Sequence, residues 1–338
     1  MCVILILTHA KDDCASLVEE HLTKENVDFV RFNTETFQED VKVTLHMEDD
    51  GSFNGCFYFP GRKVDFKKIG VIWNRRIHDP EIKTKIFESE PEIKDWILKE
   101  SIGALNLCFS LLSLKIPIVN PWDLNEKLKS NKWIQMQKAS SLGLKVPLSC
   151  VTNNIEDIKN FWLEAKKEII FKKIKKGLFE MSNGDRFLIH TSKIPEESFS
   201  DEFIQRMRFA PIFLQSHIPK KYDIRSVIVG EKVFSFAIFS QEIPEALTDY
   251  RTAFISGQLD NMRHEVIDLG PKINKTLVDF TKSFGLTFNT IDLIRTPQEE
   301  LIFLENNANG QWGWLEIKTG EKISKAFADL LKKLANID

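Results

Sequence analysis

The sequence predicts an α/β fold for the first third of the chain and a mixed α+β fold for the rest. An apolar strand at 3 to 8, a helical segment at 12 to 22 and a second strand at 27 to 33 follow one another. This strand–helix–strand order is typical of a parallel, Rossmann-like sheet. From residue 168 onward strands and hairpins dominate, with a helix at 272 to 284, which indicates the α+β part.

The overall composition is that of a folded, water-soluble protein. The chain has 338 residues, of which 43% are hydrophobic and 28% charged, so two or three packed units are expected. A net charge of -3 argues against a nucleic-acid or membrane-surface partner. Five widely spaced cysteines without a C-x-x-C pair indicate reduced thiols and a cytoplasmic location. The short apolar start predicts neither a signal peptide nor a membrane span.

The N-terminal region continues with a hairpin at Asp50-Gly51 and a strand at 69 to 76 that ends in Arg75 and Arg76. An arginine at the carboxyl end of such a strand is well placed to bind an anion, and a solvated arginine pair is the alternative. A helix at 92 to 114 follows. The first turn lacks G-x-G-x-x-G, so NAD binding is not predicted.

Residues 117 to 122 contain a short strand and a proline, and we place the first domain boundary there. The next helix has Ser130 or Asn131 as its N-cap, and Gly143 ends it.

Near the C-terminal end, "TIDLIR" and "ELIFLENN" form a predicted hairpin. In the expected register Asp292 lies opposite Phe303, Glu305 is a diagonal neighbour of Asp292, and Asn307 shares their face. Two carboxylates and an amide oxygen suit Mg²⁺. A polar hairpin end exposed to water is the alternative, and an error of one residue in the register would scatter the three side chains.

Two lysines occupy unusual positions. Lys132 lies in the first turn of its helix, where the macrodipole disfavours a positive charge. Lys172 lies in an otherwise apolar strand. Neutralising a phosphate would explain both positions, whereas a surface lysine whose stem packs on apolar side chains is the alternative for each.

The segment from Gln215 to Ile218 is an extended run whose backbone could read an adenine edge, with Lys220 or Lys221 near the ribose. Asp223 and Arg225 then share one face of a strand.

Farther along, Asp249 and Arg251 repeat this arrangement of an acidic residue two positions before an arginine. Surface ion pairs are the alternative reading of both acid–arginine arrangements.

The order of these features along the chain resembles the ATP-grasp superfamily. The resemblance is closest to the graspetide synthetases, the RimK-related peptide macrocyclases of the microviridin type, and it spans nearly the whole chain. Its sharpest signal is the closing E-x-N-x-x-G-Q-W pattern that starts at Glu305. Asn306 and Ala308 depart from the aliphatic residue and the proline that are usual there, and metal binding is expected to survive this change.

The resemblance implies a fold of three parts with ATP clasped between the last two. These are an N-terminal pre-ATP-grasp domain (1–119), a central ATP-grasp subdomain with a peptide-binding hairpin (120–212) and a C-terminal ATP-grasp subdomain (213–338). The hairpin, at 175 to 194 with its turn at Asn183-Gly184, would hold the leader of a precursor peptide.

The resemblance also implies roles for single residues. Lys132 and Lys172 would contact phosphates, and Arg225 and Arg251 would screen charge during acyl transfer. Asp223 would orient Arg225 or accept a proton. The remaining implied contacts are to adenine and ribose (Gln215, Ser216, His217, Ile218, Lys221), to two Mg²⁺ ions (Asp292, Glu305, Asn307) and to the peptide (Arg75, Arg76, Trp312).

The implied activity is that of an ATP-dependent ligase that uses Mg²⁺, or Mn²⁺ in its place. It would activate Asp or Glu side chains of a ribosomal precursor peptide, with a leader and an acidic core, as acyl phosphates. Thr, Ser or Lys side chains would then close ω-ester or ω-amide rings. The resemblance also implies a homodimer. A RimK-like amino-acid ligase, a small-molecule kinase and a non-catalytic peptide-binding protein stay open as alternatives.

Overall fold

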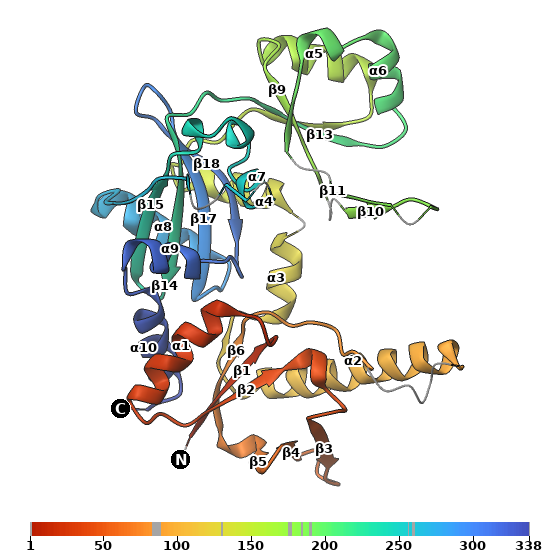
Figure 1. Cartoon of the computed structure of the whole chain (residues 1–338), viewed down its shortest axis with the longest axis vertical. Helices are drawn as coiled ribbons and strands as arrows, with labels where there is room; N and C mark the ends of the chain where they lie inside the picture. Colours follow the sequence, from red (N-terminus) through yellow and green to blue (C-terminus); the bar gives the residue numbers. More distant parts are fainter. Residues whose placement is uncertain are drawn as a thin grey trace.

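The computed structural model shows a chain folded in three parts (Figure 1). The N-terminal part lies at the bottom of the view, the large C-terminal sheet lies above it, and a smaller central part extends to the upper right. The helix α3 (Trp122–Lys129) runs from the first part toward the others. The structure describes residues 2–82, 89–129, 131–174, 178–183, 185–188, 191–255, 257–258 and 261–337.

The N-terminal part is built on a parallel sheet in the order β2-β1-β6-β7, which confirms the predicted α/β unit. All six residues of β1 are buried because the strand lies inside the sheet. The helix α1 starts after Asp12, whose carboxylate accepts a hydrogen bond from the backbone of Cys14. The elements are β1 (Val3–Thr8), α1 (Asp13–Lys24), β2 (Phe29–Asn33), β6 (Ile69–Asn74) and β7 (Ile118–Val119).

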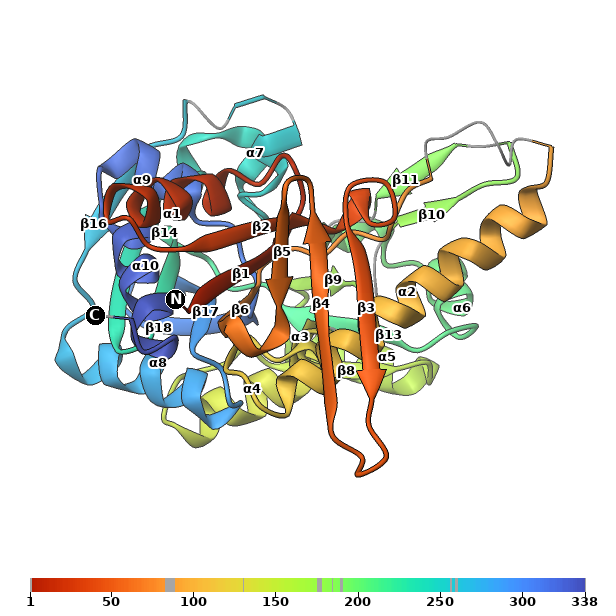
Figure 2. The same cartoon turned by 90° about the horizontal axis from the view of Figure 1, so that it is seen from below.

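A separate antiparallel sheet, β3-β4-β5, crosses the front of this part in Figure 2. Its first two strands are joined at Gly51, where φ is +78°, as the hairpin prediction requires. Phe32, Phe57 and Phe109 pack where this sheet and the long helix α2 meet the parallel sheet. The elements are β3 (Lys42–Met47), β4 (Phe53–Phe59), β5 (Arg62–Asp65) and α2 (Pro91–Ser113).

The central part has its own antiparallel sheet in the order β12-β9-β13-β8, with a core of its own against α5 and α6. The helix α4 begins at Lys132, and its N-cap is Asn131; Ser130 lies outside the described residues. The strands β10 and β11 pair as predicted, whereas Gly184 of their turn is outside the described residues. The elements are α4 (Lys132–Ser141), β8 (Ser149–Thr152), α5 (Ile155–Glu164), β9 (Ile169–Lys172), β10 (Leu178–Glu180), β11 (Arg186–Leu188), β12 (Ser192–Ile194), α6 (Asp201–Met207) and β13 (Ile212–Ser216).

The C-terminal part is a five-stranded antiparallel sheet in the order β16-β15-β14-β17-β18. The helix α8 packs on one face of this sheet, and α10 packs on the other. The elements are β14 (Tyr222–Val229), β15 (Lys232–Ile238), α7 (Thr252–Ile255), β16 (His264–Ile267), α8 (Pro271–Ser283), β17 (Phe288–Arg295), β18 (Leu301–Asn307), α9 (Gly313–Thr319) and α10 (Ile323–Leu334).

The N- and C-terminal parts share one hydrophobic core. Phe327 of α10 packs against Trp73 of β6 and Phe288 of β17, with ring centroids 4.3 and 5.1 Å apart. All three side chains are fully buried. The helices α1 and α10 lie side by side next to this core, and the two ends of the chain lie near one another (Figure 1).

The predicted register of the β17–β18 hairpin is wrong by one residue next to the turn, where Arg295 pairs with Leu301, and by two residues at its functional end. Leu293, not Asp292, pairs with Phe303, and Asp292 pairs directly with Glu305. The second residue of this shift comes from an irregularity between Asp292 and Leu293, where β18 contains one residue more than its partner strand. The two carboxylates are therefore closer neighbours than the regular register places them.

In the described part of the chain, no helix is both long and apolar enough to cross a membrane.

Candidate active site

A pocket lies between the central sheet and the C-terminal sheet. Lys172 and Gln215, at the ends of β9 and β13, line it on the central side. Asp223, Asp292 and Glu305, on β14, β17 and β18, line it on the C-terminal side. The pocket therefore combines a lysine from the central sheet with three carboxylates from the C-terminal sheet.

Glu305 is the anion at the centre of this pocket. Its carboxylate accepts hydrogen bonds from Nζ of Lys132 and from Nη1 of Arg251, the latter at 2.8 Å. Burial alone would raise the pKa of Glu305, but the Lys132 and Arg251 cations hold that pKa well below its usual range. The ion pair with Glu305 also explains why a lysine stands at position 132, in the first turn of α4, where the helix dipole disfavours a positive charge.

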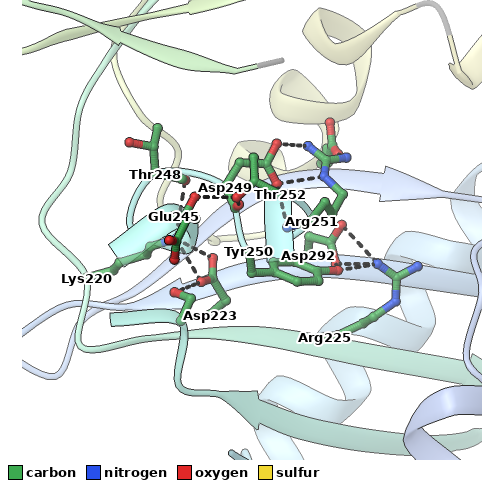
Figure 3. A network of polar contacts seen from close by, with 12 residues as sticks. Lys220, Asp223, Arg225, Glu245, Thr248, Asp249, Tyr250, Arg251, Thr252 and Asp292 are labelled. Atoms are coloured by element: carbon green, nitrogen blue, oxygen red, sulfur yellow. Dashed lines mark hydrogen bonds and ion pairs between the residues drawn. The ribbon is translucent and has the colours of Figure 1, made fainter. Parts of the chain in front are cut away.

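Asp292 forms the second anionic position. Nη1 of Arg225 lies 3.1 Å from its Oδ1, and the same nitrogen donates to the Tyr250 hydroxyl at 2.6 Å (Figure 3). Burial raises the pKa of Asp292, while Arg225 opposes this rise. Nη2 of Arg225 donates to the Thr290 hydroxyl at 3.2 Å, so three neighbours fix this guanidinium.

Lys172 is a buried cation that faces the pocket. Its exposed fraction is 6%, and burial lowers the pKa of its ammonium group to about 8. This burial excludes the surface-lysine alternative for Lys172.

A segment between β15 and α7 covers one side of the pocket with Thr248, Asp249 and Arg251. Asp249 holds Arg251 through two hydrogen bonds of 2.8 Å (Figure 3). Lys220 donates to the Thr248 carbonyl at 3.3 Å and to the Asp223 carboxylate at 2.7 Å. These contacts fix the end of the segment next to α7.

Gln215 to Ile218 line the pocket as a continuous edge. The N–H groups of Ser216 and His217 already donate to the carbonyls of Leu148 and Glu168. The N–H of Ile218 has no such partner within the described ranges of the chain, so it is the backbone donor that this edge offers to a ligand.

The protein oxygens in and beside the pocket suit Mg²⁺ only if other oxygens complete the coordination of the ion. Among the residues that the structure describes, no three His, Cys, Asp or Glu side chains are grouped to hold a metal. Asp292 and Glu305 are paired carboxylates in the pocket, while Asn307 is exposed and its Oδ1 accepts from the Asn309 backbone. Two or three protein oxygens fit a Mg²⁺ ion that keeps water and phosphate ligands.

Two of the three residues predicted to contact the peptide are buried. Arg75 is fully buried, with its Nε 3.2 Å from Asp12, so it is not available to steer a peptide from solvent. Trp312 is also fully buried, stacked on Phe327 with ring centroids 6.3 Å apart. Arg76, one residue farther along, is exposed at the same strand end.

Two further expectations are corrected on β14. Lys221 does not line the pocket; its ammonium group donates to Glu299 at 2.6 Å, in the turn between β17 and β18. Lys220 lines the pocket in its place. Asp223 contacts Lys220 rather than Arg225, so it does not orient that arginine.

Sequence reasoning missed Tyr250 and Thr290, the two hydroxyl partners of Arg225. The "TDYR" pattern contained a signal for Tyr250, because a tyrosine between an acid and an arginine combines a large apolar ring with a polar end. Thr290 gave no signal, since its role depends on the neighbouring strand.

The chain has the ATP-grasp fold, with an N-terminal pre-ATP-grasp domain. Residues 3–124 match the family model "MvdD pre-ATP grasp domain". None of the curated proteins is similar enough in sequence to match the chain.

Solved structures of similar proteins cover almost the whole chain. A RiPP-associated ATP-grasp ligase from Chryseobacterium gregarium, in complex with ADP and a leader and core peptide, has 27% identity and a TM-score of 0.87, with 98% of this chain and 97% of that chain covered. The macrocyclase MdnC from Microcystis aeruginosa MRC, bound to the precursor peptide MdnA, has 28% identity and a TM-score of 0.80, with 98% and 99% covered. The macrocyclase MdnB from the same organism has 26% identity and a TM-score of 0.76, with the same shares covered.

Proposed function

We propose that this chain is an ATP-dependent peptide ligase that closes side-chain rings in a ribosomally made precursor peptide. The observation that carries the proposal is the paired Asp292 and Glu305, which form ion pairs with Arg225, Lys132 and Arg251, in a chain that is similar over almost its whole length to RiPP ligases and macrocyclases. A carboxylate that attacks ATP is repelled by the phosphates, so fixed cations at the point of attack favour this chemistry.

In the proposed site, Lys132 and Lys172 bind phosphates, and the backbone of Gln215 to Ile218 binds adenine. Support comes from the buried ammonium of Lys172 and from the free N–H of Ile218 on the pocket edge, as far as the chain is described. Lys132 and Arg251 are paired with Glu305 in this structure. A nucleotide would give these two cations phosphate oxygens as partners.

Asp292 and Glu305, with the Asn307 amide, would hold Mg²⁺. When bound, Mg²⁺ would neutralise phosphate charge during the transfer. Arg225 keeps Asp292 oriented, and Arg251 would contact the transferred phosphoryl group. Arg76 is proposed to attract the acidic core of the peptide from its exposed position.

The proposed reaction has two steps. A peptide carboxylate takes the γ-phosphoryl group of ATP, which releases ADP and gives an acyl phosphate. A side-chain hydroxyl or amine of the same peptide then attacks the acyl carbon, the bond to phosphate breaks, and the nucleophile loses its proton. Each ring therefore removes one water from the peptide mass. A homodimer and a leader held by the β10–β11 hairpin are also part of the proposal.

The test incubates the protein with ATP, Mg²⁺ and a precursor peptide encoded near its gene, and the peptide mass is followed. Loss of one water per linkage supports the proposal. A stable gain of phosphate would indicate a small-molecule or peptide kinase, and a gain of amino-acid mass would indicate a RimK-like ligase. Bound nucleotide with an unchanged peptide would indicate a non-catalytic binding protein.

A further inference from the structure

Arg75, at the end of β6, reaches from the N-terminal domain into the loop that follows β18. Its Nη1 donates to the carbonyls of Asn309 and Gly310 at 2.9 and 3.3 Å, and its Nη2 donates to Oε1 of Gln311 at 2.5 Å. The side chain is 0% exposed. A buried charge is strongly unfavourable unless it is paired, so these contacts are a specific arrangement.

The other side of Arg75 is held by Asp12. Oδ2 of Asp12 lies 3.2 Å from Nε of Arg75 and accepts from the Thr8 hydroxyl at 2.7 Å. Oδ1 of Asp12 accepts from the Cys14 backbone at 3.2 Å. Asp12 is thus fixed between β1 and α1, and it holds Arg75 in one orientation.

The loop that Arg75 holds is in close contact with the proposed catalytic arginine. A Cβ on Gly310 would lie 1.8 Å from Oγ1 of Thr290 and 2.6 Å from Nη2 of Arg225. The backbone of Gly310 therefore occupies the space beside Arg225, and Arg225 in turn contacts Asp292. A shift of this loop would change where Arg225 can lie.

We infer that Arg75 is a positioning residue, which sets the 309–311 loop and through it Arg225 and Asp292 from the N-terminal domain. The effect on turnover rests on the proposed function, whereas the effect on the loop does not. Misplacement of reacting groups by about 1 Å can cost on the order of 100-fold in rate, so we expect Arg75 to act on kcat.

The experiment compares Arg75→Lys with the double variant Asp12→Asn/Arg75→Met. Lysine keeps the charge but cannot donate from two nitrogens to the loop. The double variant removes both members of the ion pair, and such replacements are often close to neutral for stability. In both we expect kcat for peptide ligation to fall about 10- to 100-fold, with KM for ATP within about 3-fold of its starting value. Hydrogen exchange should become faster in residues 306–315 and stay unchanged in 3–8.

The matched control is Arg62→Lys, in the same domain, because Arg62 forms an ion pair with Asp28 at 2.8 Å outside the site. It should change neither kcat nor exchange at 306–315. The inference is overturned if the double variant is as stable as the starting protein and keeps its kcat. It is also overturned if exchange at 306–315 does not change in either variant. A starting protein that ligates no peptide contradicts the proposed function alone, since the exchange measurement still tests Arg75.

Discussion

Burial of the Lys172 ammonium group lowers the stability of the folded chain, and the same group is proposed to bind phosphate. Its ammonium group is buried, and the pKa falls from 10.5 to about 8. Below about pH 8 the folded protein therefore holds a charge that burial disfavours. Between about pH 8 and 10.5 the unfolded chain binds more protons at this position than the folded chain does, so the free energy of unfolding rises with pH in this window.

Lys172→Met should remove this cost, because methionine fills a similar volume without a charge. We expect a higher unfolding midpoint at neutral pH, with a gain that shrinks as the pH rises above about 8, together with loss of turnover. Urea unfolding over a pH series measures the first effect. Lys193→Met, an exposed lysine on the neighbouring strand β12, should show no such pH-dependent gain. A destabilised Lys172→Met variant at neutral pH would contradict the prediction.

Glu305→Gln tests the anionic centre. The change keeps the shape of the side chain but removes the charge that Lys132 and Arg251 contact. We expect turnover to fall at least about 100-fold, the size of effect seen when one electrostatic contact to a transition state is lost. Titration with ADP should also lose its dependence on Mg²⁺.

Glu300→Gln is the matched control for Glu305→Gln, since Glu300 is an exposed carboxylate at the start of the same hairpin strand and pairs with Lys145. It should keep normal turnover and Mg²⁺ dependence. Unchanged turnover in Glu305→Gln would show that the paired carboxylates are not the metal site.

At the scale of elements, the β17–β18 hairpin explains which parts of the site could be predicted from the sequence. Asp292, Glu305 and Lys172 were predictable, because charges inside apolar strands contradict the local pattern. The direct pairing of Asp292 with Glu305 was not, since an irregular strand pairing leaves no fixed mark in the sequence. The burial of Arg75 was equally hidden, because its partners in the 309–311 loop are more than 230 positions away.

Gly310 is the point at which the loop after β18 approaches β17 and β14. The missing Cβ leaves room for Thr290 and Arg225, so Gly310→Ala forces an overlap that only a backbone shift relieves. We expect a loss of about 1–3 kcal/mol in unfolding free energy, as for other overpacked sites, and a clear fall in turnover. Chemical denaturation and the mass assay measure the two effects.

Gly103→Ala provides the comparison. A Cβ there meets no atom within 4 Å, and the position is an exposed turn of α2. Alanine should stabilise this helix slightly, by about 0.5–1 kcal/mol, without a change in turnover. Equal behaviour of the two variants would mean that the space beside Gly310 is not restricted.

At the scale of the whole molecule, α10 joins the first and last parts of the chain into one core. Side chains of β1, β6, β14 and β17 belong to the same buried cluster as those of this helix. The central part has a separate core, in which Phe161 and Leu214 take part. The shared core could not be predicted from the sequence, because a sequence pattern shows which side chains are buried but not which distant segment covers them.

This arrangement predicts that damage to the C-terminal helix opens the N-terminal domain. Phe327→Ala should cost about 3–5 kcal/mol and should speed thiol labelling of Cys14 and Cys108, two buried cysteines of the N-terminal part. Phe161→Ala removes a comparable ring from the central core and should leave the labelling of both cysteines unchanged. Cys108 is the stricter probe, since it belongs to a different cluster from Phe327, so faster labelling there requires cooperative opening of the domain. Labelling of Cys108 that is insensitive to Phe327→Ala would mean that α10 covers the N-terminal sheet without determining its stability.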